Sequence, residues 1–485
     1  MITLELGAVA KIVGGRLVAA DPGIQVRGPV EYDSRKAAPG GLFLALPGAR
    51  VDGHDYVPAA LAAGCVAALV TRPVAGPHIV VADGVAALSA LASAVARRLT
   101  ATVVGITGSS GKTSTKDLVA HLLPLAGPTV AAAGSMNNEL GLPYTVLRAN
   151  EQTRFLVLEL GARGVGHIRW LAEIAPPRIG AVLNVGSAHL GEFGSREAIA
   201  AAKAELVEAL PDAARGGVAV LNADDPLVRA MAARTTARVV SFGAAGGADV
   251  GAAEIRLDDG GRPSFTLRTG TEAVPVALQL VGAHHIPNAL AAAAIALEAG
   301  LAPAAIAGAL GTARAVSPWR MALTERADGV LVVNDAYNAN PESMRAGLRA
   351  LVGLAAARRG RGGRSFAVLG EMAELGPDGP AEHESLGRFA AELDLARLVV
   401  VGEAAAPIRR GAVGHPSWTG TVQEVPDAAA ALDLLRAELR AGDVVLVKAS
   451  RAASLERVAL TLAEDDQCGR AGSGPGAARA GGDEA

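Results

Sequence analysis

The sequence predicts an α/β protein of three domains: a small α/β domain over residues 1–100, a central domain with a mostly parallel sheet and a phosphate-binding loop over 101–315, and a C-terminal Rossmann-like domain over 316–463. Three observations predict this. The 485 residues exceed what one hydrophobic core usually supports. Apolar strand-like runs alternate with helical segments, and one of them leads into a glycine-rich loop that carries a lysine. Residues 464–485 have no apolar period, so we expect a disordered tail.

The first domain alternates short strands and helices. We expect helices at Tyr56–Ala63 and Val85–Arg98, and strands at Ala67–Thr71 and His78–Val81. These elements predict a small α/β domain.

Two further series of apolar runs predict the other two sheets. The central runs are Thr102–Thr107, Phe155–Leu160, Ile179–Val185 and Val218–Asn222. Their alternation with helical segments is typical of a parallel sheet with helices on both faces. After a break at Ser317-Pro318, the later runs are Val330–Asn334, Ser365–Leu369, Leu398–Val401 and Val444–Lys448. This second series predicts an open dinucleotide-fold domain.

The most informative segment is Gly105–Ser114, which follows an apolar run and leads into a helical pattern from Thr115. Glycines let backbone N–H groups turn toward phosphates, Lys112 supplies a cation to the β/γ oxygens, and the hydroxyl of Thr113 or Ser114 can ligate Mg²⁺. An isoleucine takes the first glycine position of the strict G-x-x-x-x-G-K-[ST] pattern. The context still predicts a phosphate-binding loop.

Composition excludes several classes of protein. A net charge of −3 and 3% aromatic residues argue against a nucleic-acid surface. The sequence contains no run of about 18 strongly apolar residues, which is the length needed to cross a membrane. The N-terminus lacks a basic region followed by an apolar one, so we expect a cytoplasmic protein. Cys65 and Cys468 lie far apart, which predicts neither a disulfide framework nor a cysteine metal site.

Lysine is scarce in this chain. Only six of the 45 lysine and arginine residues are lysines: Lys11, Lys36, Lys112, Lys116, Lys203 and Lys448. Where arginine is the default cation, a lysine can mark a position that needs a compact or deprotonatable amine.

Polar residues follow the predicted central strands at the edge where ligands of α/β sheets bind. Glu159 ends one strand, His189 follows the next, and Lys203 lies on the helix after it. A carboxylate, an imidazole and a loop hydroxyl suit a Mg²⁺ ion held partly by substrate phosphates. Taken singly, the glutamate could be a helix cap or an ion-pair partner, and the histidine could be structural.

Six ordered motifs resemble those of the Mur ligase family, and the resemblance covers nearly the whole chain. They are Asn137–Pro143, Glu159–Ala162, Asn184–Leu190, Ala202–Glu205, Leu221–Pro226 and Gly282–Ala289. The resemblance implies ATP and Mg²⁺ as cofactors and a monomer.

Later motifs resemble the signature of family members that add D-alanyl-D-alanine to a UDP-N-acetylmuramoyl tripeptide. They are Asp335–Pro341, Leu369–Gly376 and Lys448–Arg451. The Asp-Asn-Pro-Arg signature of the diaminopimelate-adding members is absent. Near the N-terminus, three motifs resemble the UDP-sugar-binding domain: Asp33–Arg35, Pro39–Phe43 and Asp52–His54.

The resemblance implies roles for individual residues. The ATP phosphates would be held by Gly108, Ser109, Ser110, Gly111, Lys112, Thr113 and Ser114. The metal sites would involve Thr113, Asn138, Glu159, His189 and Lys203, with Lys203 matching a carbamylated lysine. The catalytic residues would be Lys112, Lys203, His189 and Glu159. The rest of the nucleotide would be contacted by His284, Asn288, Arg320 and Asp335.

The two other substrates have their own implied contacts. The UDP-muramoyl peptide would be bound by Ser34, Arg35, Asp52, Gly53 and His54, although these segments could also be ordinary turns. The dipeptide would be bound by Tyr337, Asn338, Lys448, Ser450 and Arg451, for which packing or capping roles stay open.

We therefore expect an ATP-dependent amide ligase that acts through an acyl phosphate. Three positions depart from the family pattern: Ala449 for Gly, His285 for Asn and Leu160 for Met. None of these removes a charged or metal-binding group. The alternatives are another amide ligase of the family, adding the third peptide residue or extending folate polyglutamate, and a nucleotide-driven switch. A switch does not explain the motif cluster of the third domain, and no guanine-reading Asn-Lys-x-Asp is present.

Overall fold

The computed structural model describes residues 1–471 except 49–50, 188–189, 271, 414 and 417. The chain divides into two compact units. One contains Met1–Asp258 and Arg262–Ser317, and the other contains Asp259–Gly261 and the chain from Pro318 onward. The boundaries of the three predicted domains remain predictions.

The N-terminal part of the first unit has a five-stranded sheet in the order β2-β7-β6-β5-β4. Its strands are β2 (Arg16–Val18), β4 (Val30–Glu31), β5 (Leu42–Leu44), β6 (Ala67–Val70) and β7 (His78–Val80). A separate ladder joins β1 (Leu4–Glu5) to β3 (Gln25–Val26). The helices are α1 (Leu6–Ile12), α2 (Val57–Ala62) and α3 (Gly84–Ala96). The predicted helices and strands of this part are present, with ends shifted by at most two residues. Cys65 is buried and is a free cysteine.

The first unit also contains a nine-stranded sheet in the order β16-β15-β14-β13-β12-β11-β8-β10-β9. The seven strands β8 to β14 run parallel to one another, and β15 and β16 add an antiparallel edge. The parallel strands are β8 (Thr102–Thr107), β9 (Thr129–Ala131), β10 (Phe155–Glu159), β11 (Ile179–Val182), β12 (Val218–Asn222), β13 (Arg238–Gly243) and β14 (Val250–Leu257). The edge strands are β15 (Pro263–Thr269) and β16 (Glu272–Ala277). The four predicted central strands are all present, and β11 ends three residues earlier than predicted.

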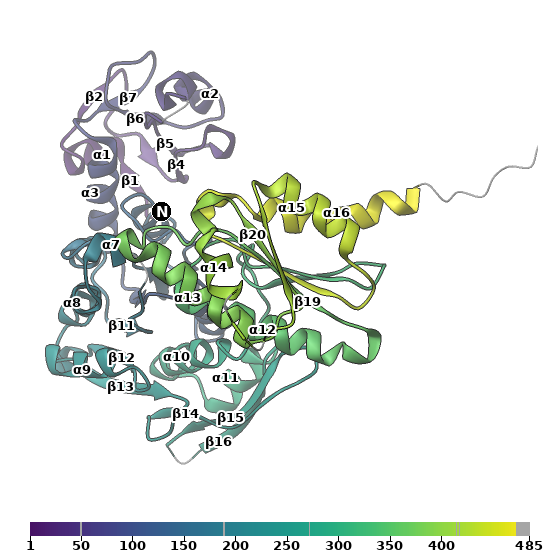
Figure 1. Cartoon of the computed structure of the whole chain (residues 1–485). Helices are drawn as coiled ribbons and strands as arrows, with labels where there is room; N and C mark the ends of the chain where they lie inside the picture. The colour runs from purple at the N-terminus through teal and green to yellow at the C-terminus, as the bar shows by residue number, and fades with distance from the viewer. Residues whose placement is uncertain (49–50, 188–189, 271, 414, 417, 472–485) are drawn as a thin grey trace, which may run out of the picture. The chain divides into compact units, whose positions relative to one another are not determined.

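Helices cover both faces of this sheet (Figure 1), as the alternating pattern predicts. One face packs on α4 (Lys112–Leu122), α10 (His285–Glu298) and α11 (Pro303–Leu310). The other packs on α5 (Gly141–Val146), α6 (His167–Ile174), α8 (Arg196–Glu208) and α9 (Pro226–Ala230), and α7 (Leu190–Phe193) precedes α8. The core on this second face continues into the N-terminal sheet, because α3 packs against α5 and α6.

The second unit has a six-stranded sheet in the order β17-β18-β22-β19-β20-β21, parallel except for β17. Its strands are β17 (Ala322–Glu325), β18 (Leu331–Asn334), β19 (Ser365–Leu369), β20 (Arg397–Val401), β21 (Thr421–Val425) and β22 (Val444–Lys448). Helices α12 (Pro341–Ala357), α13 (Gly379–Glu392) and α14 (Pro407–Val413) lie on one face. Helices α15 (Ala428–Glu438) and α16 (Glu456–Ala471) lie on the other (Figure 1).

The C-terminal helix corrects one prediction. Residues 464–471, assigned from the sequence to a disordered tail, continue α16 as far as Ala471. Asp465 in this segment forms an ion pair with Arg436 of α15, with Nη2 and Oδ1 2.6 Å apart. A contact between charged side chains leaves no apolar period in the sequence, so the sequence pattern does not indicate it. No helix in the described part of the chain is long and apolar enough to cross a membrane.

Candidate active site

The glycine-rich loop connects β8 directly to α4. The helix begins at Lys112, three residues earlier than the helical pattern predicts. Gly111 precedes it in the left-handed conformation, with φ of 79°, and no side chain caps the helix. A side chain at this position would also collide, because its Cβ would lie 2.5 Å from Oδ1 of Asn288. The loop therefore presents an uncapped helix N-terminus, which favours binding of an anion.

The loop is held from the neighbouring strand β11. Asn184, just beyond β11, accepts a hydrogen bond from the Ser110 backbone N–H at 2.9 Å and donates one to the Ser110 carbonyl at 3.1 Å. The Ser109 hydroxyl accepts a hydrogen bond from the Gly186 N–H at 2.9 Å. Lys112 donates from Nζ to the Gly108 carbonyl at 2.6 Å. These contacts fix the loop main chain, and Ser114 lies on the first turn of α4 behind them.

Two predicted metal-site residues meet beneath the loop. The Thr113 hydroxyl donates to Oε2 of Glu159 at 3.0 Å, and both side chains are buried, Glu159 being 1% exposed. The Thr113 hydroxyl also lies 2.7 Å from the Ser135 hydroxyl, and Asn137 donates from Nδ2 to Oε1 of Glu159 at 2.8 Å. The sequence analysis missed Ser135 and Asn137, although Asn137 begins one of the motifs.

Asn138, another predicted metal-site residue, forms hydrogen bonds with the backbone at the start of α5. Oδ1 of Asn138 accepts the backbone N–H groups of Gly141 at 2.9 Å and Leu140 at 3.3 Å, at the start of α5. His189 lies outside the described residues. Within the residues that the structure does describe, no group of three His, Cys, Asp or Glu side chains could hold a metal ion.

Lys203 lies on α8 and is buried, with 5% of its surface exposed. Burial and, to a smaller extent, the positive charge of Lys112 hold the pKa of Lys203 well below its usual range. Both effects disfavour the ammonium form. An uncharged amine is the form that can react with an electrophile.

Two of the predicted nucleotide contacts, His284 and Asn288, lie at the start of α10. Asn288 is buried and contacts Gly111 of the phosphate loop, whereas His284 precedes the helix. The rings of His284 and His285 lie 4.3 Å apart. Burial, with a smaller contribution from His284, lowers the pKa of His285 well below its usual range. Asn288 and the phosphate loop are thus brought together, and the nucleotide contacts remain predictions.

The predicted substrate residues of the N-terminal sheet lie in two short 3₁₀ turns. Ser34 begins the first, in which the carboxylate of Asp33 accepts two hydrogen bonds from the Arg35 guanidinium at 2.9 and 2.8 Å. This pairing lowers the pKa of Asp33 to about 2, and 86% of the Arg35 side chain is exposed. Arg35 therefore presents a cation at the surface.

The second turn begins at Gly53 and centres on His54, which is 4% exposed. Asp52 accepts the backbone N–H of His54 at 2.9 Å and contacts its Nδ1 at 2.6 Å, while Nε2 accepts the Thr71 N–H at 3.0 Å. The Thr71 contact assigns the ring proton to Nδ1. Asp52 also accepts a hydrogen bond from Arg72 at 3.0 Å. These contacts give the turn a structural role, and substrate binding there remains a prediction.

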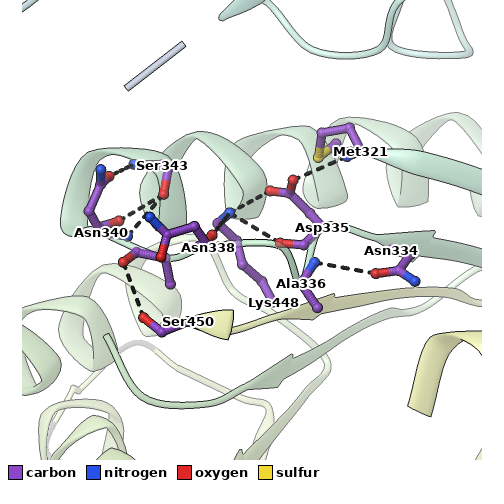
Figure 2. Close-up of polar contacts among 10 residues, drawn as sticks. Met321, Asn334, Asp335, Ala336, Asn338, Asn340, Ser343, Lys448 and Ser450 are labelled. Carbon is purple, nitrogen blue, oxygen red and sulfur yellow. Dashed lines mark hydrogen bonds and ion pairs between the residues drawn. The ribbon is translucent and has the colours of Figure 1, made fainter. Parts of the chain in front are cut away.

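Four predicted residues of the second unit lie at or just beyond the carboxyl ends of β18 and β22: Asp335, Asn338, Lys448 and Ser450 (Figure 2). Lys448 is 2% exposed and donates from Nζ to Oδ2 of Asp335 at 2.5 Å and to the Asn338 carbonyl at 3.1 Å. Oδ1 of Asp335 accepts the Met321 N–H at 3.1 Å, and the Ser450 hydroxyl donates to the Ala339 carbonyl at 3.4 Å. Lys448 thus cross-links the loop that follows β18.

Aromatic rings and guanidinium groups form a second feature of this edge. The Arg320 guanidinium lies 4.2 Å from the centroid of the Tyr337 ring, and that of Arg451 lies 4.4 Å from the Trp319 ring. Arg451 also pairs with the buried Glu456 at 2.6 Å. Trp319, with φ of 58°, was not predicted from the sequence, and its backbone is strained. The cation–π contacts orient both guanidinium groups, and ligand binding by them remains a prediction.

Comparison with known proteins identifies the family of this chain. Three family models match: the Mur ligase family catalytic domain at residues 28–96, the Mur ligase middle domain at 106–296, and the Mur ligase glutamate ligase domain at 319–451. A UDP-N-acetylmuramoyl-tripeptide--D-alanyl-D-alanine ligase of Mycobacterium bovis is 52% identical, with 97% of this chain and 99% of that protein covered.

Two solved structures extend the match to the fold. MurF from Acinetobacter baumannii is 32% identical with a TM-score of 0.82, covering 95% of this chain and 99% of that one. The MurF ligase of Thermotoga maritima in complex with ADP is 31% identical with a TM-score of 0.76, covering 91% and 98%. The predicted three-domain α/β fold class is confirmed. The chain belongs to the Mur ligase family.

Proposed function

We propose that this chain is an ATP-dependent ligase that joins D-alanyl-D-alanine to the terminal carboxylate of a UDP-N-acetylmuramoyl tripeptide, in the synthesis of peptidoglycan precursors. The observation that carries the proposal is 52% identity, over 97% of the chain, to a ligase with that printed name. The ADP complex of the Thermotoga MurF ligase supports ATP as the nucleotide. A monomeric state and a cytoplasmic location remain predictions.

The reaction needs an activated carboxyl group, because a carboxylate has no adequate leaving group. A carboxylate oxygen of the tripeptide forms a bond to the γ-phosphorus while the bond to ADP breaks. The amine of D-alanyl-D-alanine then attacks the carbonyl carbon of this acyl phosphate, phosphate leaves with the bonding electrons, and the amine loses a proton. The backbone N–H groups at the start of α4 and the Lys112 ammonium group would stabilise the negative charge on the transferred group.

The residues below the loop fit Mg²⁺. Thr113 and Glu159 provide hard oxygen atoms 3.0 Å apart in a buried position, the chemistry that Mg²⁺ prefers. They would hold the ion together with Asn138, His189 and Lys203. Magnesium, when bound, supplies positive charge beside the phosphates.

Lys203 would join this set as a carbamate. Its buried, uncharged amine can add to the carbon of CO₂, and loss of one proton leaves an anionic oxygen ligand. Mass spectrometry of the intact protein with and without ¹³CO₂, in the absence of ATP, tests this step without relying on activity.

The other substrates would bind at the remaining predicted sites. The exposed Arg35 cation suits the diphosphate of the UDP-muramoyl peptide, with Ser34, Asp52, Gly53 and His54 in the adjoining turns. His284, Asn288, Arg320 and Asp335 would contact the nucleotide. Tyr337, Asn338, Lys448, Ser450 and Arg451 would form the side of the site that receives the dipeptide.

Phosphate release with each co-substrate present or omitted tests the proposal. We expect release to require ATP, the UDP-muramoyl tripeptide and D-alanyl-D-alanine together, and to fall sharply with L-alanyl-L-alanine. Equal rates with a free amino acid would favour another amide ligase of the family. Release without any amine would favour a nucleotide-driven switch.

A further inference from the structure

His383 is a buried histidine in the second unit that none of the roles above uses. It lies on α13 and is 3% exposed. Its Nε2 accepts the backbone N–H of Met372 at 2.8 Å, and its Nδ1 lies 2.7 Å from the Gly379 carbonyl. Because Nε2 accepts, the ring proton is on Nδ1 and is donated to Gly379. The imidazole therefore bridges its own helix to the loop that follows β19.

That loop, Gly370–Ala373, is held at each of its four residues. The Gly370 N–H donates to the Lys448 carbonyl at 3.0 Å, and the Glu371 carbonyl accepts the Ser450 N–H at 2.9 Å. Ala373 donates its N–H to the Ser450 hydroxyl at 2.9 Å. Three of these four anchors come from β22 and the residues after it. The fourth, at Met372, comes from the His383 side chain on α13.

The loop approaches the end of β22 closely, and this approach requires a glycine at position 370. A Cβ on Gly370 would lie 2.8 Å from the Ala449 Cβ, so a side chain there would push the loop away. Ser450 also donates to the Ala339 carbonyl, in the loop after β18. The loops that follow β18, β19 and β22 are thus tied together at one edge, where open α/β sheets bind ligands.

We propose that His383 is a positioning residue for the dipeptide side of the site: it holds the main chain of Met372 so that the loop Gly370–Ala373 keeps the shape that receives D-alanyl-D-alanine. The inference rests on the proposed function. His383 acts through the loop and does not touch the substrate. Without it, the buried Met372 N–H loses its acceptor, and the loop must be ordered when the dipeptide binds.

Two substitutions separate the acceptor from the packing of the ring. His383→Leu removes both hydrogen bonds, whereas the side-chain oxygen of His383→Gln can still accept from Met372. We expect His383→Leu to raise the KM for D-alanyl-D-alanine by about tenfold, with the KM for ATP changed less than about twofold. His383→Gln should recover most of the loss. His78→Leu is the matched control, since His78 is equally buried and contacts the Gly76 carbonyl through Nδ1 at 2.8 Å, in the N-terminal sheet.

Hydrogen–deuterium exchange of the peptide containing Met372 gives a readout that does not depend on the reaction. We expect its amide to exchange about tenfold faster in His383→Leu and at nearly the parent rate in His383→Gln. A folded His383→Leu variant with unchanged exchange, or with equal changes in every KM, overturns the inference. If His383→Leu does not fold, His383→Gln must keep the Met372 amide protected, and loss of that protection is equally decisive. If the parent protein shows no phosphate release that depends on D-alanyl-D-alanine, the proposed function fails, while exchange still reports whether His383 holds the loop.

Discussion

Two buried lysines, Lys203 on helix α8 and Lys448 at the end of strand β22, have opposite electrostatic surroundings. Lys448 has an anion beside it, because Oδ2 of Asp335 lies 2.5 Å from its Nζ. Lys203 is acted on by burial and by a second cation, Lys112, and both lower its pKa. A buried ammonium paired with a carboxylate is a cross-link, whereas a buried amine beside a second cation is held in its uncharged form.

The scarcity of lysine gains meaning from this comparison. Lys116 is also buried, donating to the Ala132 carbonyl at 2.7 Å, and Lys112 is half-buried in the phosphate loop. Lys11 and Lys36 are exposed. In a chain that uses arginine for most surface cations, lysine is retained mainly where a compact amine is enclosed by the fold.

The largest effect should come from Lys112, the cation that we propose faces the phosphates. Lys112→Ala should lower kcat by at least about 100- to 1,000-fold, because no other group replaces its charge on the transferred phosphoryl group. Circular dichroism should be unchanged, and the exposed Lys11→Ala is the control. Activity within tenfold of the parent would remove the phosphate-loop assignment.

Lys203 tests the uncharged side of the comparison. Lys203→Ala should be nearly inactive and partly restored by acetate or formate, since these can supply an oxygen ligand. Lys203→Arg should not be restored, because a guanidinium still fills the position and cannot be deprotonated. Turnover should be measured with and without the added carboxylate. The metal-ligand role of Lys203 is wrong if Lys203→Arg is active and the mass spectrum of the parent protein shows no CO₂ adduct.

Sequence reasoning succeeded where burial leaves a simple pattern. Strands such as β12 and β19 have the predicted ends, because parallel strands covered on both faces are continuous apolar runs. The hairpin β14–β16 was missed, since its outer strands are partly exposed and mix apolar with polar residues. Thr113 meets Glu159 because Thr113 follows β8, Glu159 ends β10, and these two parallel strands are neighbours.

The parts of the site that could not be predicted depend on crossover loops and on partners distant in sequence. Ser135 reaches Thr113 from the segment after β9, and nothing in its spacing indicates this. The family resemblance implies that Lys448 contacts the dipeptide, but it does not indicate that the Lys448 amine is bonded to Asp335. His383 contacts a loop eleven residues earlier through the main chain, which leaves no side-chain signature in the sequence.

Replacing each lysine by methionine tests the comparison as stability. Lys448→Met leaves a buried Asp335 carboxylate without its partner, which costs about 3–5 kcal/mol and should lower the melting temperature by roughly 10 °C. Lys203→Met removes a group whose charged form is unfavourable, so its melting temperature should be unchanged or higher. Calorimetry on the four proteins completes the test: the parent, both single variants, and Lys448→Met with Asp335→Asn, which should regain most of the loss. Equal destabilisation by the two single variants would contradict the proposed difference.

The smallest effect is expected at the ion pair that joins α15 and α16. Arg436 and Asp465 also form a short contact, and the hydrogen bond from Arg436 lowers the pKa of Asp465, but both side chains are open to water. Solvent screens such a pair and offers each partner other hydrogen bonds, so Asp465→Ala should change the melting temperature by no more than about 1 °C. Truncation after Ala471 should leave both the melting temperature and the kinetics unchanged, whereas truncation after Ala463 also removes the last two turns of α16. If truncation after Ala471 lowers the melting temperature as much as Lys448→Met does, residues 472–485 contribute to stability. The contrast between buried and exposed ion pairs would then no longer explain where this unit obtains its stability.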